Sequence, residues 1–251
     1  MKALTPETVH GYIRVLKAFC TWLVIEDALA DSPFRRVKTP FVPKHQPTPL
    51  TDEELKELLQ ACKVARVTGS RNSGKVDSGR VPYSAQATLW SARDAAIILT
   101  LVSTALRVSE LLSMKRDTIT PAGSVTVLGK GRKVRSVQMH PSARKAVWKY
   151  QALRTDPHEE LWVGIRGPLT ADGVADILSA RSATAGIRHV NPHLLRHTAA
   201  VRFLRNKGPM EALMEILGHT SLEMTRRYVK LADTDVAESH RDHNPLKGLK
   251  W

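Results

Sequence analysis

The sequence is poor in cysteine and has no long apolar run. Only Cys20 and Cys62 occur among its 251 residues. They form neither a metal-type pair nor a disulfide framework, which is typical of a protein in a reducing cytoplasm. No stretch approaches the roughly 18 apolar residues of a membrane span. Residues 1–6 carry a charge, but no apolar segment follows them as in a signal peptide. We therefore expect a cytoplasmic protein with no membrane partner.

Acidic residues are scarce relative to basic ones. The 38 Lys and Arg residues outnumber the 24 Asp and Glu residues, which gives a formal net charge of +14 and an isoelectric point near 10.1. This balance suits a polyanionic partner, although a soluble basic surface has the same composition. We find no basic amphipathic helix of the kind that binds a membrane surface.

Two common catalytic motifs are also missing. The segment Gly129-Lys130-Gly131 is not a nucleotide-binding P-loop, because no G-x-x-x-x-G-K-[ST] pattern surrounds it. His193 and His197 have the spacing of zinc ligands on a helix, but a metalloprotease has glutamate where Leu194 stands. The sequence therefore predicts no bound metal and no cofactor, and we interpret His197 as a packing residue.

Prolines separate a short N-terminal segment from the rest of the chain. Apolar residues recur at spacings of three and four over about residues 5–27, which predicts a helix. Because one helix cannot bury such a stripe alone, residues 1–47 resemble the remnant of a small helical domain followed by a proline-rich linker.

A larger domain is predicted over residues 48–232. It opens with a capping box at residues 51–54. Inside it, residues 63–83 are rich in Gly, Ser and basic residues and lack helical periodicity. We interpret them as an exposed, mobile basic loop, either a solvated insertion or an arm that contacts DNA. Residues 233–251 form a C-terminal tail.

The periodicity of the larger domain predicts helices around one hairpin. We expect one or two buried helices over residues 92–114, and two strands at 124–128 and 134–139. The sequence predicts Asn191 as an N-cap, with Pro192 at the first helical position. The other helices are expected at residues 143–153, 170–185, 209–217 and from 220 onward.

Arg107 and Lys130 are the first candidates for chemistry. Arg107 lies in an apolar stretch, where a charge requires a partner. That partner is either Glu110, which would make the pair structural, or a bound phosphate. Lys130 lies at the tip of the predicted hairpin, between glycines that allow close approach to a ligand. It is either a general acid or a turn lysine in water.

Four further candidates follow near the C-terminus. His193 and Arg196 lie three residues apart in the first turn after Pro192, where free N–H groups favour an anion. A guanidinium can grip two phosphate oxygens, and a histidine can move a proton near neutral pH. His219 follows a glycine at a helix boundary, and Tyr228 lies nine residues later. Each residue taken alone has a plain structural interpretation.

The ordered set of six resembles the tyrosine recombinase (phage integrase) family. The matching segments are TALRVSEL (104–111), LGKG (128–131), HLLRHT (193–198) and LGHTSLEMTRRY (217–228). The resemblance implies a catalytic domain that is mainly α with a small antiparallel β-sheet. It implies a site-specific DNA recombinase or integrase of a mobile element that needs neither metal nor ATP.

The family's chemistry carries over to matching residues. Tyr228 would attack the scissile phosphate and form a 3′-phosphotyrosyl bond. His193 would handle the tyrosine proton, and Lys130 would protonate the departing 5′ oxygen. Arg107 and Arg196 would stabilise charge on the non-bridging oxygens. The remaining expected contacts are His219 with the phosphate, and Arg132, Lys133, Arg226 and Arg227 with DNA.

The expected partner is double-stranded DNA with specific recombination sites, placing the protein at the nucleoid. The resemblance implies a homotetramer on DNA and allows a monomer when free. Two other functions share these features: a DNA-binding relic that does not cut, and a type IB-like topoisomerase. Two departures from the family matter. Members often have glycine where Ala105 stands. The family's helical core-binding domain normally precedes the catalytic one, but only its last helix and linker are expected here, so we expect an N-terminally shortened form or a fragment.

Overall fold

The chain separates into two units, residues 1–46 and residues 47–251. The computed structural model describes residues 4–39, 47–63, 83–129, 134–219 and 221–232. The smaller unit contains α1 (Pro6–Ile25), which begins after the N-cap Thr5 as the apolar stripe predicted. That this unit is the remnant of a helical domain stays a prediction. No helix in the described ranges is long and apolar enough to span a membrane.

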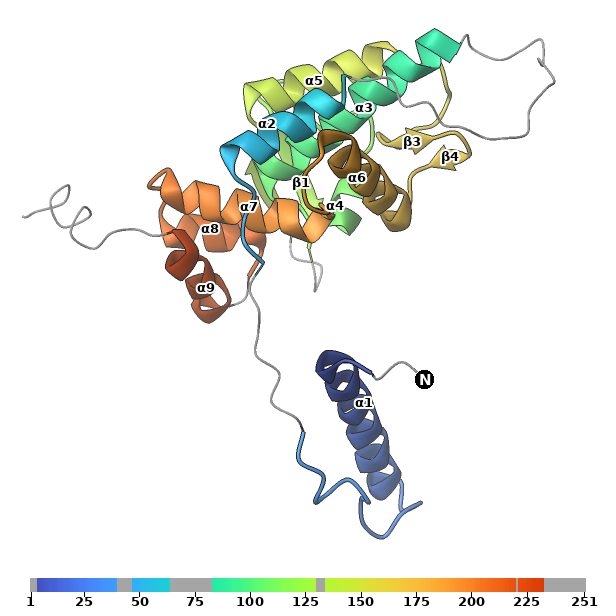
Figure 1. Ribbon diagram of the computed structural model, residues 1–251, viewed down its shortest axis with the longest axis vertical. Helices are drawn as coiled ribbons and strands as arrows, with labels where there is room; N and C mark the ends of the chain where they lie inside the picture. The colour runs from blue at the N-terminus through green and yellow to red at the C-terminus, as the bar shows by residue number, and fades with distance from the viewer. Residues whose placement is uncertain (1–3, 40–46, 64–82, 130–133, 220, 233–251) are drawn as a thin grey trace, which may run out of the picture. The chain divides into compact units, whose positions relative to one another are not determined.

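The larger unit is mainly helical, as predicted, and its described residues include two short antiparallel sheets, β1–β2 and β3–β4 (Figure 1). In chain order its elements are α2 (Asp52–Ala61), α3 (Tyr83–Thr104), α4 (Val108–Leu112), β1 (Ser124–Leu128), β2 (Val134–Gln138), α5 (Pro141–Ala152), β3 (Val163–Gly164), β4 (Gly167–Pro168), α6 (Ala171–Ala185), α7 (Pro192–Arg205), α8 (Met210–Leu217) and α9 (Leu222–Ala232).

The predicted helix starts follow from local hydrogen bonds. Thr51 and Glu54 form the expected capping box at the start of α2. Asn191 accepts a hydrogen bond from the N–H of Leu194, which places Pro192 at the first position of α7. The segment predicted over 92–114 is divided into α3 and α4, and α3 begins earlier, at Tyr83.

The hairpin has the predicted strands in antiparallel register. Val125 pairs with Val137, and Val127 pairs with Arg135. Because side chains alternate across a strand, these four residues share one face. The three valines are buried, so this face of the hairpin packs on the core. The expected tip residues, 130–133, lie outside the described part of the chain.

Two apolar clusters hold the larger unit together. The larger cluster includes Ile97 and Leu101 of α3, which packs against α5 and also contacts α7. The smaller cluster joins α7, α8 and α9, which lie beside one another in Figure 1. It contains Ala105 and Tyr228. The helix that carries Tyr228 is therefore held against α7 by apolar burial, the main favourable term in folding.

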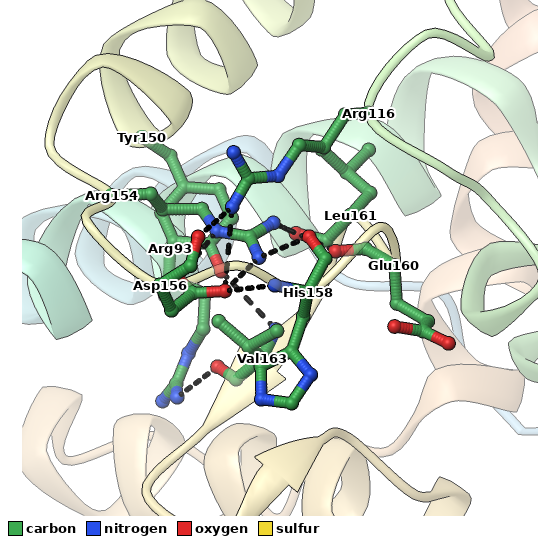
Figure 2. A network of polar contacts seen from close by, with 9 residues as sticks. All are labelled: Arg93, Arg116, Tyr150, Arg154, Asp156, His158, Glu160, Leu161 and Val163. Atoms are coloured by element: carbon green, nitrogen blue, oxygen red, sulfur yellow. Dashed lines mark hydrogen bonds and ion pairs between the residues drawn. The ribbon is translucent and has the colours of Figure 1, made fainter.

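A polar network fixes the connection between α5 and β3 (Figure 2). Arg154, whose side chain is fully buried, donates to the backbone carbonyls of His158, Glu160 and Leu161. It also binds the Asp156 carboxylate, and this contact lowers the pKa of Asp156 to about 2. These bonds satisfy backbone groups that a connecting segment would otherwise leave without partners.

Candidate active site

Three arginine side chains meet the last turn of α8. The pairs are Arg135 Nε with the carbonyl oxygen of Ile216 (3.0 Å), Arg196 Nη2 with that of Leu217 (2.6 Å), and Arg107 Nη2 with that of Gly218 (3.4 Å). The last carbonyl groups of a helix accept no hydrogen bond from N–H groups within the helix, and they lie at the negative end of its dipole. The end of α8 therefore gathers guanidiniums from β2, from α7 and from the residue before α4.

Arg107 shares the carboxylate of Glu110 with Arg135. Glu110 accepts from Nη1 of Arg107 (3.0 Å) and takes a bidentate pair of bonds from Arg135 (2.7 and 2.8 Å). Burial alone would raise the pKa of the Glu110 carboxyl, but the hydrogen bonds from Arg135 and Arg107 lower it to about 2. Glu110 is therefore ionised at neutral pH, and one negative charge faces two positive ones.

Arg196 lies in the first turn and a half of α7 and is 7% exposed. Its Nη1 donates to the carbonyl oxygen of Ala105 (2.5 Å) and its Nη2 to that of Leu217. Burial and the neighbouring Arg107 cation lower the pKa of the Arg196 guanidinium to about 10, so it stays charged at neutral pH. Among the described residues, no carboxylate forms an ion pair with it. A bound anion would supply that missing charge.

Ala105 has a backbone conformation that favours glycine. Its φ is +51°, in the left-handed region, and it is 3% exposed. This conformation turns the chain between α3 and α4 and presents the Ala105 carbonyl oxygen to Arg196. Ala105, which stands where family members often have glycine, therefore occupies a position where glycine would be unstrained.

His219 and Tyr228 come together at the end of the same turn. Gly218 has a φ of +59° and ends α8, as the sequence predicted. The His219 and Tyr228 rings are stacked with centroids 6.2 Å apart, and the His197 ring lies 5.3 Å from Tyr228 on a tilt. His219 Nδ1 is 2.9 Å from the hydroxyl of Thr225, which is on α9. His197 is a packing residue, as interpreted above.

The remaining predicted residues are not all brought to this turn. His193 is exposed at the start of α7, and no contact with Arg196 or Tyr228 is seen for it within the described ranges. Arg226 is exposed on α9. Lys130, Arg132, Lys133 and the side chain of Arg227 lie outside the described part of the chain. Their roles stay predictions.

Sequence reasoning missed Arg135 and Thr225. A signal for Arg135 was present, because it lies two residues before Val137 and so shares the apolar face of the strand. Its side chain is 13% exposed. Thr225 is fully buried and lies three residues before Tyr228, so both side chains share a face of α9. A threonine at that spacing gave no sign that it would contact a histidine.

Comparisons with known proteins agree with this geometry. The family model described as "Phage integrase family" matches residues 81–235. Tyrosine recombinase XerC of Bacillus subtilis (strain 168) is 30% identical over 255 residues, covering 97% of this chain and 77% of that protein. XerC of Bacillus pumilus (strain SAFR-032) is 31% identical, with the same two coverages.

Solved structures show the same fold. The XerA recombinase matches with a TM-score of 0.61 and 26% identity, over 93% of this chain and 75% of that one. The Tn1549 transposon integrase in complex with a circular intermediate DNA matches with a TM-score of 0.70 and 19% identity, over 96% and 80%. The predicted fold class and the predicted enzyme class, a site-specific recombinase, are confirmed. The chain belongs to the phage integrase family, the tyrosine recombinases.

Proposed function

We propose that Tyr228 is the nucleophile of this recombinase, and that Arg107 and Arg196 bind the scissile phosphate. The observation that carries the assignment is the meeting of both guanidiniums at the last turn of α8, directly before His219. The Tyr228 ring stacks on that histidine. Two fixed cations beside a phenol are what a phosphodiester needs, because negative charge grows on the non-bridging oxygens during attack.

The reaction is a transesterification. The phenol oxygen of Tyr228 forms a bond to phosphorus, and the bond from phosphorus to the 5′ oxygen breaks. His193 takes the phenol proton, and Lys130 gives a proton to the leaving 5′ oxygen. A 5′-hydroxyl of a second strand then attacks the phosphotyrosine and releases Tyr228. Bond energy is conserved in the protein–DNA linkage, so no ATP is consumed.

His219 donates a hydrogen bond to the phosphate. Its Nδ1 faces the Thr225 hydroxyl. When that hydroxyl donates, Nδ1 accepts and the ring proton resides on Nε2, which can then act as a donor. A histidine in this tautomer can donate a hydrogen bond while it is neutral.

Double-stranded DNA is the partner that the relatives support. The Tn1549 integrase was solved with a circular intermediate DNA, and XerH with a palindromic difH substrate in a post-cleavage complex. The net charge of +14 fits such a partner. We further propose that the chain acts at specific sites, as a homotetramer on paired DNA.

Covalent trapping tests the nucleophile. A duplex selected by binding from a randomised library is resynthesised with a nick beside each candidate cleavage position, so that the short product strand diffuses away. The wild-type chain should give an adduct that resists detergent, and Tyr228→Phe should give none. An adduct that persists in Tyr228→Phe would refute the assignment. Binding without any adduct in the wild type would favour a DNA-binding relic.

A further inference from the structure

We infer that Arg135 is a positioning residue for strand transfer: it neutralises Glu110, so that the charge of Arg107 remains available to the phosphate. The inference rests on the proposed function, because it assigns Arg107 to the phosphate. No motif pointed to Arg135, and it belongs to β2 rather than to the helices that carry Arg196 and Tyr228.

The contacts of Arg135 join three elements. Its two terminal nitrogens bind the two oxygens of Glu110 on α4, at 2.7 and 2.8 Å. Its Nε donates to Ile216 at the end of α8, at 3.0 Å. Every nitrogen of the guanidinium is therefore engaged by protein, and the parallel pair of bonds to one carboxylate is the strong, oriented kind.

The charges explain why this pairing matters. The guanidinium of Arg107 contacts the same carboxylate through a single nitrogen, Nη1, at 3.0 Å, and the side chain is 31% exposed. The backbone N–H of Arg107 also donates to this carboxylate, at 2.7 Å. Arg135 is more buried, at 13%, and holds both oxygens. The bidentate partner takes up most of the Glu110 charge, and Arg107 keeps a donor-rich, partly exposed guanidinium. If Arg135 were absent, Glu110 would neutralise Arg107 and compete with the phosphate for it.

Close packing at Gly218 supports a fixed position for this guanidinium. A Cβ built on Gly218 would lie 3.2 Å from Nη1 of Arg135. The turn that precedes His219 therefore lies directly against Arg135. Arg135 is also five residues after Lys130 in the sequence, so its anchoring fixes the strand that leads from the predicted general acid.

A double-mutant cycle that removes each charge tests the inference on the full chain. The rate of adduct formation is measured on the nicked duplex at saturating protein for Arg135→Gln, Glu110→Gln and the double variant. Arg135→Gln should slow attachment by about tenfold or more, the effect of roughly one strong interaction. Adding Glu110→Gln should recover most of the lost rate, because the competing carboxylate is gone. The glutamine keeps an oxygen that can accept the hydrogen bond from the backbone N–H of Arg107.

The control is Arg166→Gln, which removes the same charge from an exposed residue between β3 and β4. It should keep the wild-type rate, with binding followed separately by fluorescence anisotropy. If the double variant does not stay folded in thermal melts, Arg135→Ala is tested with added guanidinium ions. Recovery of the rate would support the inference.

Several outcomes separate the inference from the proposed function. A double variant that is folded and as slow as Arg135→Gln, or slower, would show that Arg135 only holds the fold. A lack of rescue by guanidinium would show the same for Arg135→Ala. Both results would overturn the inference while leaving a Tyr228-dependent adduct in the wild type. Failure of the proposed function would instead appear as no such adduct in the wild type.

Discussion

Arg107 and Arg196 donate to the carbonyl oxygens of adjacent residues, Gly218 and Leu217, although Arg107 precedes α4 and Arg196 lies far along the sequence on α7. The shared acceptor is the C-terminal turn of α8, which has unpaired carbonyls and the negative end of a helix dipole. These carbonyls bring two cations together without neutralising either of them. The site can therefore keep net positive charge for a phosphate.

The left-handed backbone of Ala105 should determine how substitutions there change the free energy of unfolding. We expect Ala105→Gly to change the free energy of unfolding by less than about 1 kcal/mol, because relief of strain offsets the lost methyl burial and the added chain entropy. Ala105→Val should cost more than about 2 kcal/mol, since a β-branched residue fits this φ poorly. Urea unfolding provides the measurement.

The matched control for this pair is Ala200→Gly. Ala200 is fully buried within α7, so the same change there should cost about 2 kcal/mol from lost helix propensity and methyl burial. An equal cost for glycine at positions 105 and 200 would contradict the strain assigned to Ala105.

Glu110 should make stability depend on acid pH. Its pKa is lowered from 4.5 to about 2 in the folded chain. The stabilisation it provides is therefore fully present above its unfolded pKa and is lost as the pH falls through about 4.5 toward 2. The size is on the order of 3 kcal/mol. Denaturant unfolding at neutral pH and at about pH 3 measures the part of this stabilisation that is lost above pH 3, on the order of 2 kcal/mol.

The comparison variant for this effect is Glu110→Gln, which cannot titrate. Asp156 also has a pKa lowered to about 2, so part of the acid sensitivity should remain in that variant. The difference between the wild type and Glu110→Gln isolates Glu110. Identical pH slopes for the two proteins would rule out an ionised, arginine-bound Glu110.

Thr225 should control the tautomer of His219. The hydroxyl lies 2.9 Å from Nδ1, and we expect it to donate, which leaves the proton on Nε2. Thr225→Val removes the hydroxyl at nearly constant shape and should slow adduct formation by about tenfold, the value of one hydrogen bond. Thr225→Ser should retain the rate. Nitrogen-15 chemical shifts of the histidine ring report the tautomer directly.

A purely structural role for Thr225 gives a different pattern. It predicts lower melting temperatures for the valine variant with an unchanged ring tautomer. The serine variant would then lose stability too, because it lacks the buried methyl group. That set of results would show that Thr225 does not set the tautomer of His219.

Local signals predicted the helices and the hairpin well. Asn191-Pro192, the Thr51 capping box and Gly218 each mark a helix end through hydrogen bonds between neighbours in sequence. β3 and β4 were missed, because two-residue strands are too short to show an alternating pattern. The early start of α3 was missed because residues 83–91 adjoin a segment without periodicity.

Long-range polar contacts were not predictable in the same way. The sequence offered Glu110 as one partner of Arg107, but its sharing with Arg135 depends on where β2 lies against α4. Asp94 of α3 is fully buried and binds Arg181 of α6, a pair that no local pattern marks. Such contacts are specified by tertiary packing, so residue types alone leave their partners open.

The most direct test is to identify the residue joined to DNA. The trapped adduct is digested with nuclease and protease, and the modified peptide is sequenced by mass spectrometry. We expect a nucleotide attached through its 3′ phosphate to the phenol oxygen of Tyr228. Attachment to any other side chain, or through a 5′ phosphate, would contradict the central claim that the cations at the end of α8 present a phosphate to Tyr228.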